Sequence, residues 1–216
     1  MALRVLSSLA TKGVLEEFRG EFERAAGALD LQFAATQAIL PRLAQGEKVD
    51  LLVLTAEAMD ALRVQGKVTE AFALGGSGVG VAVRAGAPRP AIGTVDEFVR
   101  ALNAAGSVAH SKVGASGIYF SQLLERLPVR LQRRVVVEQG PVALAVARGE
   151  AELGIQQLCE LAPVPGIDIV GPLPAAVQST THFAAGIPAD AADPRGARAL
   201  VDLMRKRIDP RRHYIG

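Results

Sequence analysis

Small polar side chains follow the first predicted strand, at the point where a helix is expected to begin. Ser7 and Ser8 come directly after the apolar residues LRVL, and Thr11 precedes an amphipathic helical pattern over residues 14–22. Hydroxyls at such a junction can cap the helix. The free backbone N–H groups and the positive end of the helix dipole can also hold an anion there. The residues support two interpretations, capping alone or capping combined with anion binding.

The same pattern recurs further along the chain. The predicted strand 107–111 ends in Ser111 and leads through KVGASG into a helix, with Ser116 and Gly117 near its start. The strand 31–35 leads into Thr36, and a strand that begins near residue 152 ends in two glutamines. Ligands of open α/β sheets bind at the carboxyl ends of the strands. Hydroxyls, amides and glycine N–H groups suit a small anion held by neutral donors, so the repetition favours an anion site.

Other chemical templates fit the sequence poorly. GGSGVG lacks the Lys-Ser/Thr ending of a phosphate loop and precedes a strand, and GASGIY has Ile118 where a nucleophile elbow needs its second glycine. The histidines His110, His182 and His213 are dispersed without metal-ligand spacing, so no metal site is predicted. His110 and Lys112 lie beside the proposed site and are the candidate proton carriers if the protein is an enzyme.

Composition narrows the class of protein. Half of the 216 residues are hydrophobic, which is enough for one large domain or two lobes without disulfides. A net charge of +2 and the absence of Trp argue against nucleic acid as a partner. The single Cys159 has no internal disulfide partner and is predicted to be a buried core residue. No stretch reaches transmembrane length or resembles a signal peptide, so we predict no membrane insertion. The location is cytoplasmic if Met1 is native and periplasmic if a leader was removed.

Strands and helices alternate along the chain, which predicts α/β layers with parallel strands. A capping box is predicted at Thr94 and Glu97. The passages GGSG (75–78) and PLPAAVQSTT (172–181) look weakly structured and are predicted to be crossings between two lobes, one of residues 1–78 and 180–216, the other of 79–179. The predicted strands are 3–6, 31–35, 49–56, 79–86, 107–111, 133–139, one from about 152, 167–174 and 182–188; the predicted helices are 14–22, 37–45 interrupted at Pro41, 58–64, 94–105, one following KVGASG, 141–148 and 194–206.

Three segments resemble the periplasmic molybdate-binding proteins: LRVLSSLATKGVLEEFRGEFE, GEKVDLLVLTAEAMDALRVQGKV and ARGEAELGIQQLCEL. The order of elements is similar over nearly the whole chain. The resemblance implies the two-lobed α/β fold of the type II solute-binding proteins, with a ligand cleft between the lobes. It also implies ligand contacts at Ser8, with Ser7 beside it, and at Ala115, Ser116 and Gly117. Gln156 and Gln157 stand where the family has late Tyr or Val contacts, and their amides suit a carboxylate.

The resemblance and the residues together leave three functions open. The first is binding of a small anion, either an oxyanion such as molybdate or an organic di- or tricarboxylate, without a cofactor, by a monomer that serves an ABC permease if it is exported. The second is a cofactor-independent organic-acid isomerase, as in the aconitate isomerases, which resemble the same fold; His110 or Lys112 would move the proton. The third is the effector domain of a LysR-like regulator. The candidate ligand-binding residues are Ser7, Ser8, Thr36, Ser77, Ser111, Ala115, Ser116, Gly117, Gln156 and Gln157.

Overall fold

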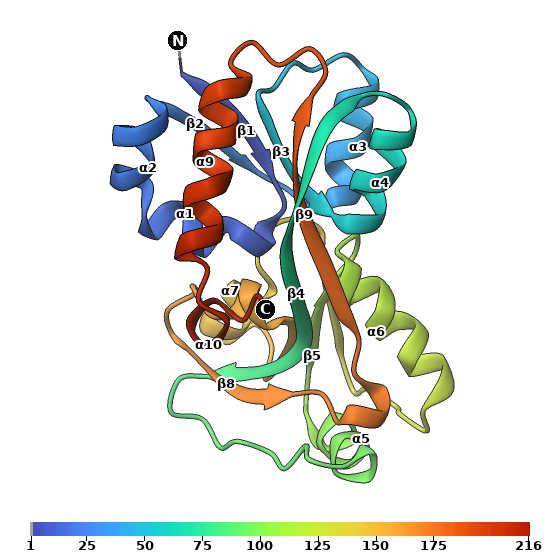
Figure 1. Ribbon diagram of the computed structural model, residues 1–216. Coiled ribbons are helices and arrows are strands. Elements are labelled where there is room, and N and C mark those ends of the chain that lie inside the picture. Colours follow the sequence, from blue (N-terminus) through green and yellow to red (C-terminus); the bar gives the residue numbers. More distant parts are fainter. Residues whose placement is uncertain (1) are drawn as a thin grey trace. The chain divides into compact units, whose positions relative to one another are not determined.

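A computed structural model describes residues 2–216, which form nine β-strands, ten α-helices and two short 3-10 helices (Figure 1). These residues divide into two compact units. Residues 2–76 and 182–216 form unit 1, and residues 77–181 form unit 2. The chain passes from unit 1 to unit 2 within strand β4 (Val68–Arg84) and returns within strand β9 (Thr180–Pro188).

Unit 1 is built on a mixed sheet. Strands β1 (Leu3–Ser7), β2 (Leu29–Phe33) and β3 (Leu51–Thr55) are parallel, with β1 in the middle, and β9 runs antiparallel to β3. The N-terminal part of β4 lies next to β9. The helices of this unit are η1 (Leu9–Thr11), α1 (Lys12–Glu17), α2 (Arg19–Ala26), α3 (Thr36–Ala44), α4 (Ala56–Val64), α9 (Pro194–Arg207) and α10 (Pro210–His213).

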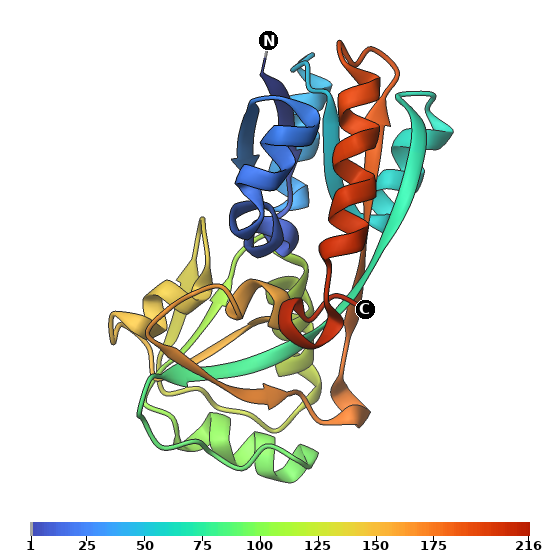
Figure 2. The same ribbon diagram turned by 60° about the vertical axis from the view of Figure 1, so that its left-hand side comes forward.

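Helices cover both faces of the unit 1 sheet, because successive strand residues point to opposite faces. Val5 and Val53 are buried in the core that α1, α2 and α9 share, and Leu6 and Leu52 are buried in the core of α3 and α4. Figures 1 and 2 both show α9 running along the sheet beside α1 and α2. A sheet buried on both faces explains the continuous apolar run LLVL in β3.

One buried carboxylate joins distant segments of unit 1. Asp50, which is 4% exposed, precedes β3. Its Oδ2 accepts from the N–H of Arg4 (2.9 Å), and its Oδ1 accepts from the N–H groups of Ala192 (2.8 Å) and Asp193 (3.0 Å). Asp193 is itself the N-cap of α9 and accepts from the Gly196 N–H. Asp50 therefore connects the start of β1 with the start of α9.

Unit 2 has the same layered construction. Strands β5 (Val108–Ser111), β6 (Arg134–Val137) and β7 (Leu153–Gln157) are parallel, and β7 and β8 (Ile167–Pro172) flank the C-terminal part of β4 in antiparallel fashion. One face carries the core of α5 and α6, and the other face packs against α7 and α8. The helices are α5 (Val95–Ala104), α6 (Ala115–Arg126), α7 (Val142–Ala147), α8 (Leu158–Leu161) and η2 (Ala175–Val177).

The structure confirms one local prediction and contradicts two others. The capping box is confirmed: Thr94 Oγ1 accepts from the Glu97 N–H (3.2 Å), and Glu97 Oε2 accepts from the Thr94 N–H (3.0 Å). The predicted interruption at Pro41 is wrong, because α3 continues through it to Ala44. The prediction that GGSG is weakly structured is also wrong, since residues 75–78 lie inside β4. Gly75 is in a positive-φ conformation there (φ +127°), which the missing side chain permits.

Candidate functional site

Three strand-to-helix junctions lie at one edge of the unit 1 sheet. The parallel strands β1, β2 and β3 end at Ser7, Phe33 and Thr55, and η1, α3 and α4 begin within three residues of these ends. The carboxyl ends of parallel strands share an edge of the sheet, so the polar residues of the junctions gather there. Ser7, Ser8, Thr11 and Thr36 are all buried.

The predicted capping role of the first junction is wrong. In the part of the chain that the structure describes, neither Ser8 at the start of η1 nor Thr11 at the start of α1 makes a side-chain cap bond. The Ser7 hydroxyl instead donates to the Ser8 carbonyl (2.8 Å) and lies 2.8 Å from Thr11 Oγ1. Ser7 and Thr11 therefore satisfy each other within the protein.

Ser8 differs from its neighbours. Ser8 is 4% exposed. Among residues 2–216, its Oγ is the one buried side-chain polar atom that has no hydrogen-bond partner. An unpartnered buried hydroxyl costs about 1–3 kcal/mol. Its backbone N–H is already engaged with the Val53 carbonyl (2.7 Å), which fixes the residue against β3. The backbone of Ser8 is therefore fixed in position, and its hydroxyl can still donate a hydrogen bond.

Thr36 links the start of α3 to the end of β3. Its Oγ1 accepts from the N–H of Thr55 (3.2 Å), the last residue of β3. This bond ties the first residue of α3 to the end of the neighbouring strand. The hydroxyl proton of Thr36 can still be donated.

In unit 2, the start of α6 packs unusually closely on the end of β5. A Cβ built on Gly117 would lie 1.9 Å from the Ser111 carbonyl oxygen, and one on Gly114 would lie 2.5 Å from Ser111 Oγ. Ser111 Oγ accepts from the Gly114 N–H (3.2 Å), and the Gly117 N–H donates to the Gly114 carbonyl (3.0 Å). The two glycines therefore permit close packing, and Ser111 holds the turn. Ala115, the first residue of α6, has only backbone groups to offer a ligand.

Ser116 connects α6 to the end of β7 through Gln157. The neighbours of the Gln157 amide assign its orientation. In this orientation the nitrogen donates to Ser116 Oγ (2.9 Å), and the oxygen accepts from the Ser116 N–H (3.2 Å) and from Thr181 Oγ1 (3.0 Å). Both Ser116 and Gln157 are 1% exposed. Because Ser116 Oγ accepts this bond, its own proton is left to donate elsewhere.

A carboxyl that the sequence reasoning missed completes this group. Glu160 lies in the one-turn helix α8 directly after β7. Gln156 Nε2 donates to Glu160 Oε2, and Gln157 donates to Glu160 Oε1 (3.3 Å). Gln156 Oε1 accepts from the N–H of Val142 at the start of α7 (2.9 Å). We call Ser116, Gln156, Gln157, Glu160 and Thr181 the unit 2 polar cluster.

Burial raises the pKa of Glu160 to about 7, and the hydrogen bond from Gln156 opposes the shift only in part. No ion pair of residues 2–216 includes this carboxylate. A carboxyl with a pKa near neutrality can both donate and accept a proton at physiological pH. The sequence signal was only a glutamate placed three residues after Gln157, within an apolar segment.

The raised pKa predicts how stability depends on pH. Between its ordinary pKa of 4.5 and about 7, Glu160 keeps its proton in the folded state and loses it in the unfolded state. Stability should therefore fall as the pH rises through this window, by on the order of 1–3 kcal/mol. Glu160→Gln should lack that fall, whereas Glu125→Gln on the exposed side of α6 should retain it. Urea unfolding at pH 5, 6, 7 and 8 measures this; parallel pH curves for Glu160→Gln and wild type would contradict it.

The two residues predicted as proton carriers lie in different environments, His110 buried and Lys112 exposed. His110 is 2% exposed; its Nδ1–H donates to the Ser111 carbonyl (2.9 Å), and its Nε2 accepts from Arg134 Nε. Burial, and then the Arg134 charge, lower its pKa, and both of its ring nitrogens are occupied by hydrogen bonds. Lys112 is exposed and forms an ion pair with Glu138 (2.9 Å). Neither residue has a hydrogen bond to the unit 2 polar cluster among the described residues.

Ser77 and Cys159 form a structural contact. Ser77 Oγ accepts from the Cys159 N–H (3.1 Å), and both residues are at most 3% exposed. Burial raises the pKa of the Cys159 thiol, which keeps it protonated and unreactive. The predicted core position of Cys159 is confirmed.

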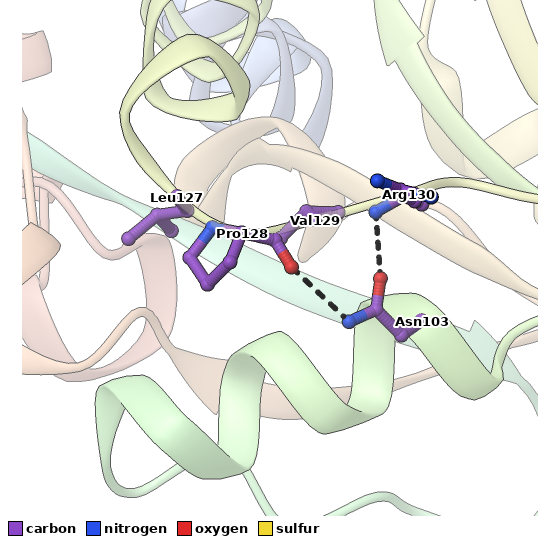
Figure 3. A pocket seen from close by; sticks show the side chains of 5 residues that line it. All are labelled: Asn103, Leu127, Pro128, Val129 and Arg130. Atoms are coloured by element: carbon purple, nitrogen blue, oxygen red, sulfur yellow. Dashed lines mark hydrogen bonds between the residues drawn. The ribbon is translucent and has the colours of Figure 1, made fainter.

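A hollow beside α5 is lined by residues whose polar contacts are structural. Figure 3 shows Asn103 with Leu127, Pro128, Val129 and Arg130 around it. The Asn103 amide donates to the Pro128 carbonyl (3.4 Å) and accepts from the Arg130 N–H (2.7 Å). Asn103 therefore fastens the segment after α6 to α5. Residues 2–216 contain no cluster suited to hold a metal ion, and none of their helices is long and apolar enough to cross a membrane.

The layered units, the strand order and the polar strand ends define a class of protein. The family model for bacterial extracellular solute-binding proteins matches residues 3–207, and the chain belongs to this family. A curated relative, the aconitate isomerase of Pseudomonas sp., is 39% identical over 214 residues, which cover 94% of this chain and 81% of that protein. The predicted α/β fold of the type II solute-binding proteins is confirmed.

Solved structures share this fold at low sequence identity. The periplasmic molybdate-binding protein of Azotobacter vinelandii superposes with a TM-score of 0.76 at 20% identity, over 94% of this chain and 92% of that one. The CcmR regulatory domain of Synechocystis PCC6803, in complex with 2-PG, gives 0.66 at 15% identity, over 95% and 96%. The fold therefore occurs both in binding proteins and in regulatory domains.

Proposed function

We propose that this protein binds a small organic di- or tricarboxylate. The candidate donors are the Ser8 hydroxyl of unit 1 and, taken by itself, the polar cluster of unit 2. The observation that carries the proposal is the buried Ser8 hydroxyl, which has no partner among the described residues. A carboxylate oxygen would satisfy it, since charge-assisted bonds are the strong ones. The family membership supports a small ligand, with an ABC permease as the partner if the protein is exported.

The unit 2 polar cluster favours a carboxylate over molybdate as the ligand. Ser116 and the two glutamine amides are neutral groups that can both donate and accept. Glu160 beside them would repel a bare oxyanion once ionised, whereas it can share a proton with a carboxylate. The curated relative acts on aconitate, an unsaturated tricarboxylate, which supports the same ligand class.

A second candidate function is isomerisation of an unsaturated carboxylic acid. The relative at 39% identity is an isomerase, and a carboxyl with a pKa of about 7 lies in the polar cluster. Proton transfer between carbons requires a group that can both take up and release a proton near neutrality, and Glu160 is such a group. Binding is common to both candidates and is tested first.

Titration calorimetry with molybdate, sulfate, citrate and both aconitate isomers tests the binding. Ser8→Ala should weaken carboxylate binding about 10- to 100-fold, because a hydrogen bond to a charged group is lost. It should not lower the melting temperature, since the hydroxyl has no partner in the protein to lose.

Ser7→Ala is the matched control for this prediction. Its hydroxyl is engaged with Ser8 and Thr11, so the substitution should cost stability of about 1 kcal/mol and affect binding less. Unchanged affinity in Ser8→Ala, together with a lower melting temperature, would make Ser8 a structural residue. Binding of molybdate but of no carboxylate would overturn the proposed ligand class.

A further inference from the structure

Glu160 occupies a position built to hold a carboxyl group in one orientation. Both of its oxygens are approached by glutamine amides, from Gln156 on one side and Gln157 on the other. These amides are fixed in turn by the Val142 N–H, Ser116 and Thr181. Oriented neighbours of this kind leave the side chain few alternative positions, which is what proton transfer at a defined atom needs.

We propose that Glu160 is the catalytic residue that carries the proton in the isomerisation of an unsaturated carboxylate. The inference rests on the second candidate function. It assigns to Glu160 the role that the sequence suggested for His110 or Lys112.

The step is a proton shift between two carbons. The Glu160 carboxylate removes a proton from the CH₂ carbon next to the C=C bond, and the C–H electron pair forms a new C=C bond while the old π pair moves onto the conjugated carboxylate as a dienolate. The protonated Glu160 then returns the proton to the other end of the allylic system, and the enolate pair forms that C–H bond. One proton leaves and one returns, so no oxidant, reductant or cofactor is consumed. Hydroxyls such as Ser116 can donate to the enolate oxygen.

The surroundings of Glu160 suit this cycle. Its pKa of about 7 makes both protonation states available near neutrality. The elements packed against α8 are β7, α7, β8 and the part of β4 that carries the uncharged Ser77 and Gly80. β7 and α7 carry no ionisable side chain, and Asp168 of β8 is bound to the Gly86 N–H and to Arg89. The one other titratable group beside it in the described chain is the Cys159 thiol, which stays protonated because its pKa is raised.

The experiment follows trans- and cis-aconitate by NMR with the full chain, in wild type and in Glu160→Gln. The substitution keeps the shape and a hydrogen-bonding group but cannot take a proton. We expect conversion to fall at least about 100-fold. The dissociation constant from calorimetry should change less than about 3-fold, which corresponds to under 0.7 kcal/mol. Deuterium uptake from D₂O at the allylic carbon should be lost as well. Wild-type kcat/KM should rise with pH with an inflection near 7, absent from any residual rate of the variant.

Glu125→Gln is the control, because it makes the same charge change on an exposed residue of the same unit. It should convert aconitate at the wild-type rate. If wild type binds and converts aconitate and Glu160→Gln does so equally fast, the assignment of Glu160 is overturned while the isomerase function stands. If wild type binds without conversion or deuterium uptake, both the isomerase function and the role of Glu160 fail, and binding remains. If no carboxylate binds, the proposed function itself fails.

Discussion

Replacement of Asp50 by alanine is expected to lower the free energy of unfolding by roughly 3–5 kcal/mol. The Asp50 carboxylate accepts hydrogen bonds from the N–H groups of Arg4, Ala192 and Asp193, and the substitution leaves these donors without a partner. A buried donor without a partner carries its full desolvation cost. The loss is large because one side chain serves two segments that are distant in the sequence.

Urea unfolding followed by circular dichroism measures this effect. Asp60→Ala is the matched control, since Asp60 lies exposed on α4 and its ion pair with Arg63 is long (3.8 Å). Its effect should stay below about 1 kcal/mol. Equal, small changes for the two variants would show that water replaces the Asp50 carboxylate at no cost.

Gly117→Ala is expected to destabilise the protein by about 1–3 kcal/mol and to weaken ligand binding at the same time. The added Cβ would meet the backbone carbonyl of Ser111 at 1.9 Å, so α6 must move away from the end of β5. Ser116 moves with it and loses its geometry toward Gln157. Thermal unfolding and calorimetry with the carboxylate that binds wild type measure the two effects.

Gly20→Ala provides the comparison. Gly20 lies in α2, and the nearest atom to its added Cβ is the end of the Arg24 side chain at 3.7 Å. The alanine should stabilise the helix by up to about 1 kcal/mol, because glycine is a poor helix former. A Gly117→Ala variant that keeps wild-type stability and affinity would mean that α6 shifts freely, and the packing argument would be wrong.

The fold could be predicted because its signals are local. Apolar runs such as LLVL in β3, and the reciprocal spacing of Thr94 and Glu97, depend on residues close in the sequence. The glycines of GGSG suggested a flexible passage, yet pairing with distant strands holds them in β4. Tertiary context overrode the local preference there.

The candidate site was predictable in part. The positions of Ser8 and Ser116 at strand-to-helix junctions follow from the alternation of strands and helices. Which hydroxyl stays unpartnered depends on how Ser7 turns toward Thr11, and no sequence pattern reveals that rotamer. Glu160 was missed for a related reason: its pKa reflects burial by segments far apart in the chain, which periodicity does not report.

The division of the chain has a consequence for biosynthesis. Unit 2 is one continuous stretch, residues 77–181, whereas unit 1 takes most of β9 and all of α9 and α10 from residues 182–216. During translation from the N-terminus, unit 2 is complete before unit 1 has its remaining strand and two helices. Later α9 covers apolar residues of β1 and β3, such as Val5 and Val53. These residues stay uncovered by α9 until that segment has left the ribosome. The nascent chain is therefore expected to depend on a chaperone during this interval, and stalled chains ending near residue 181 should bind one more strongly than finished chains.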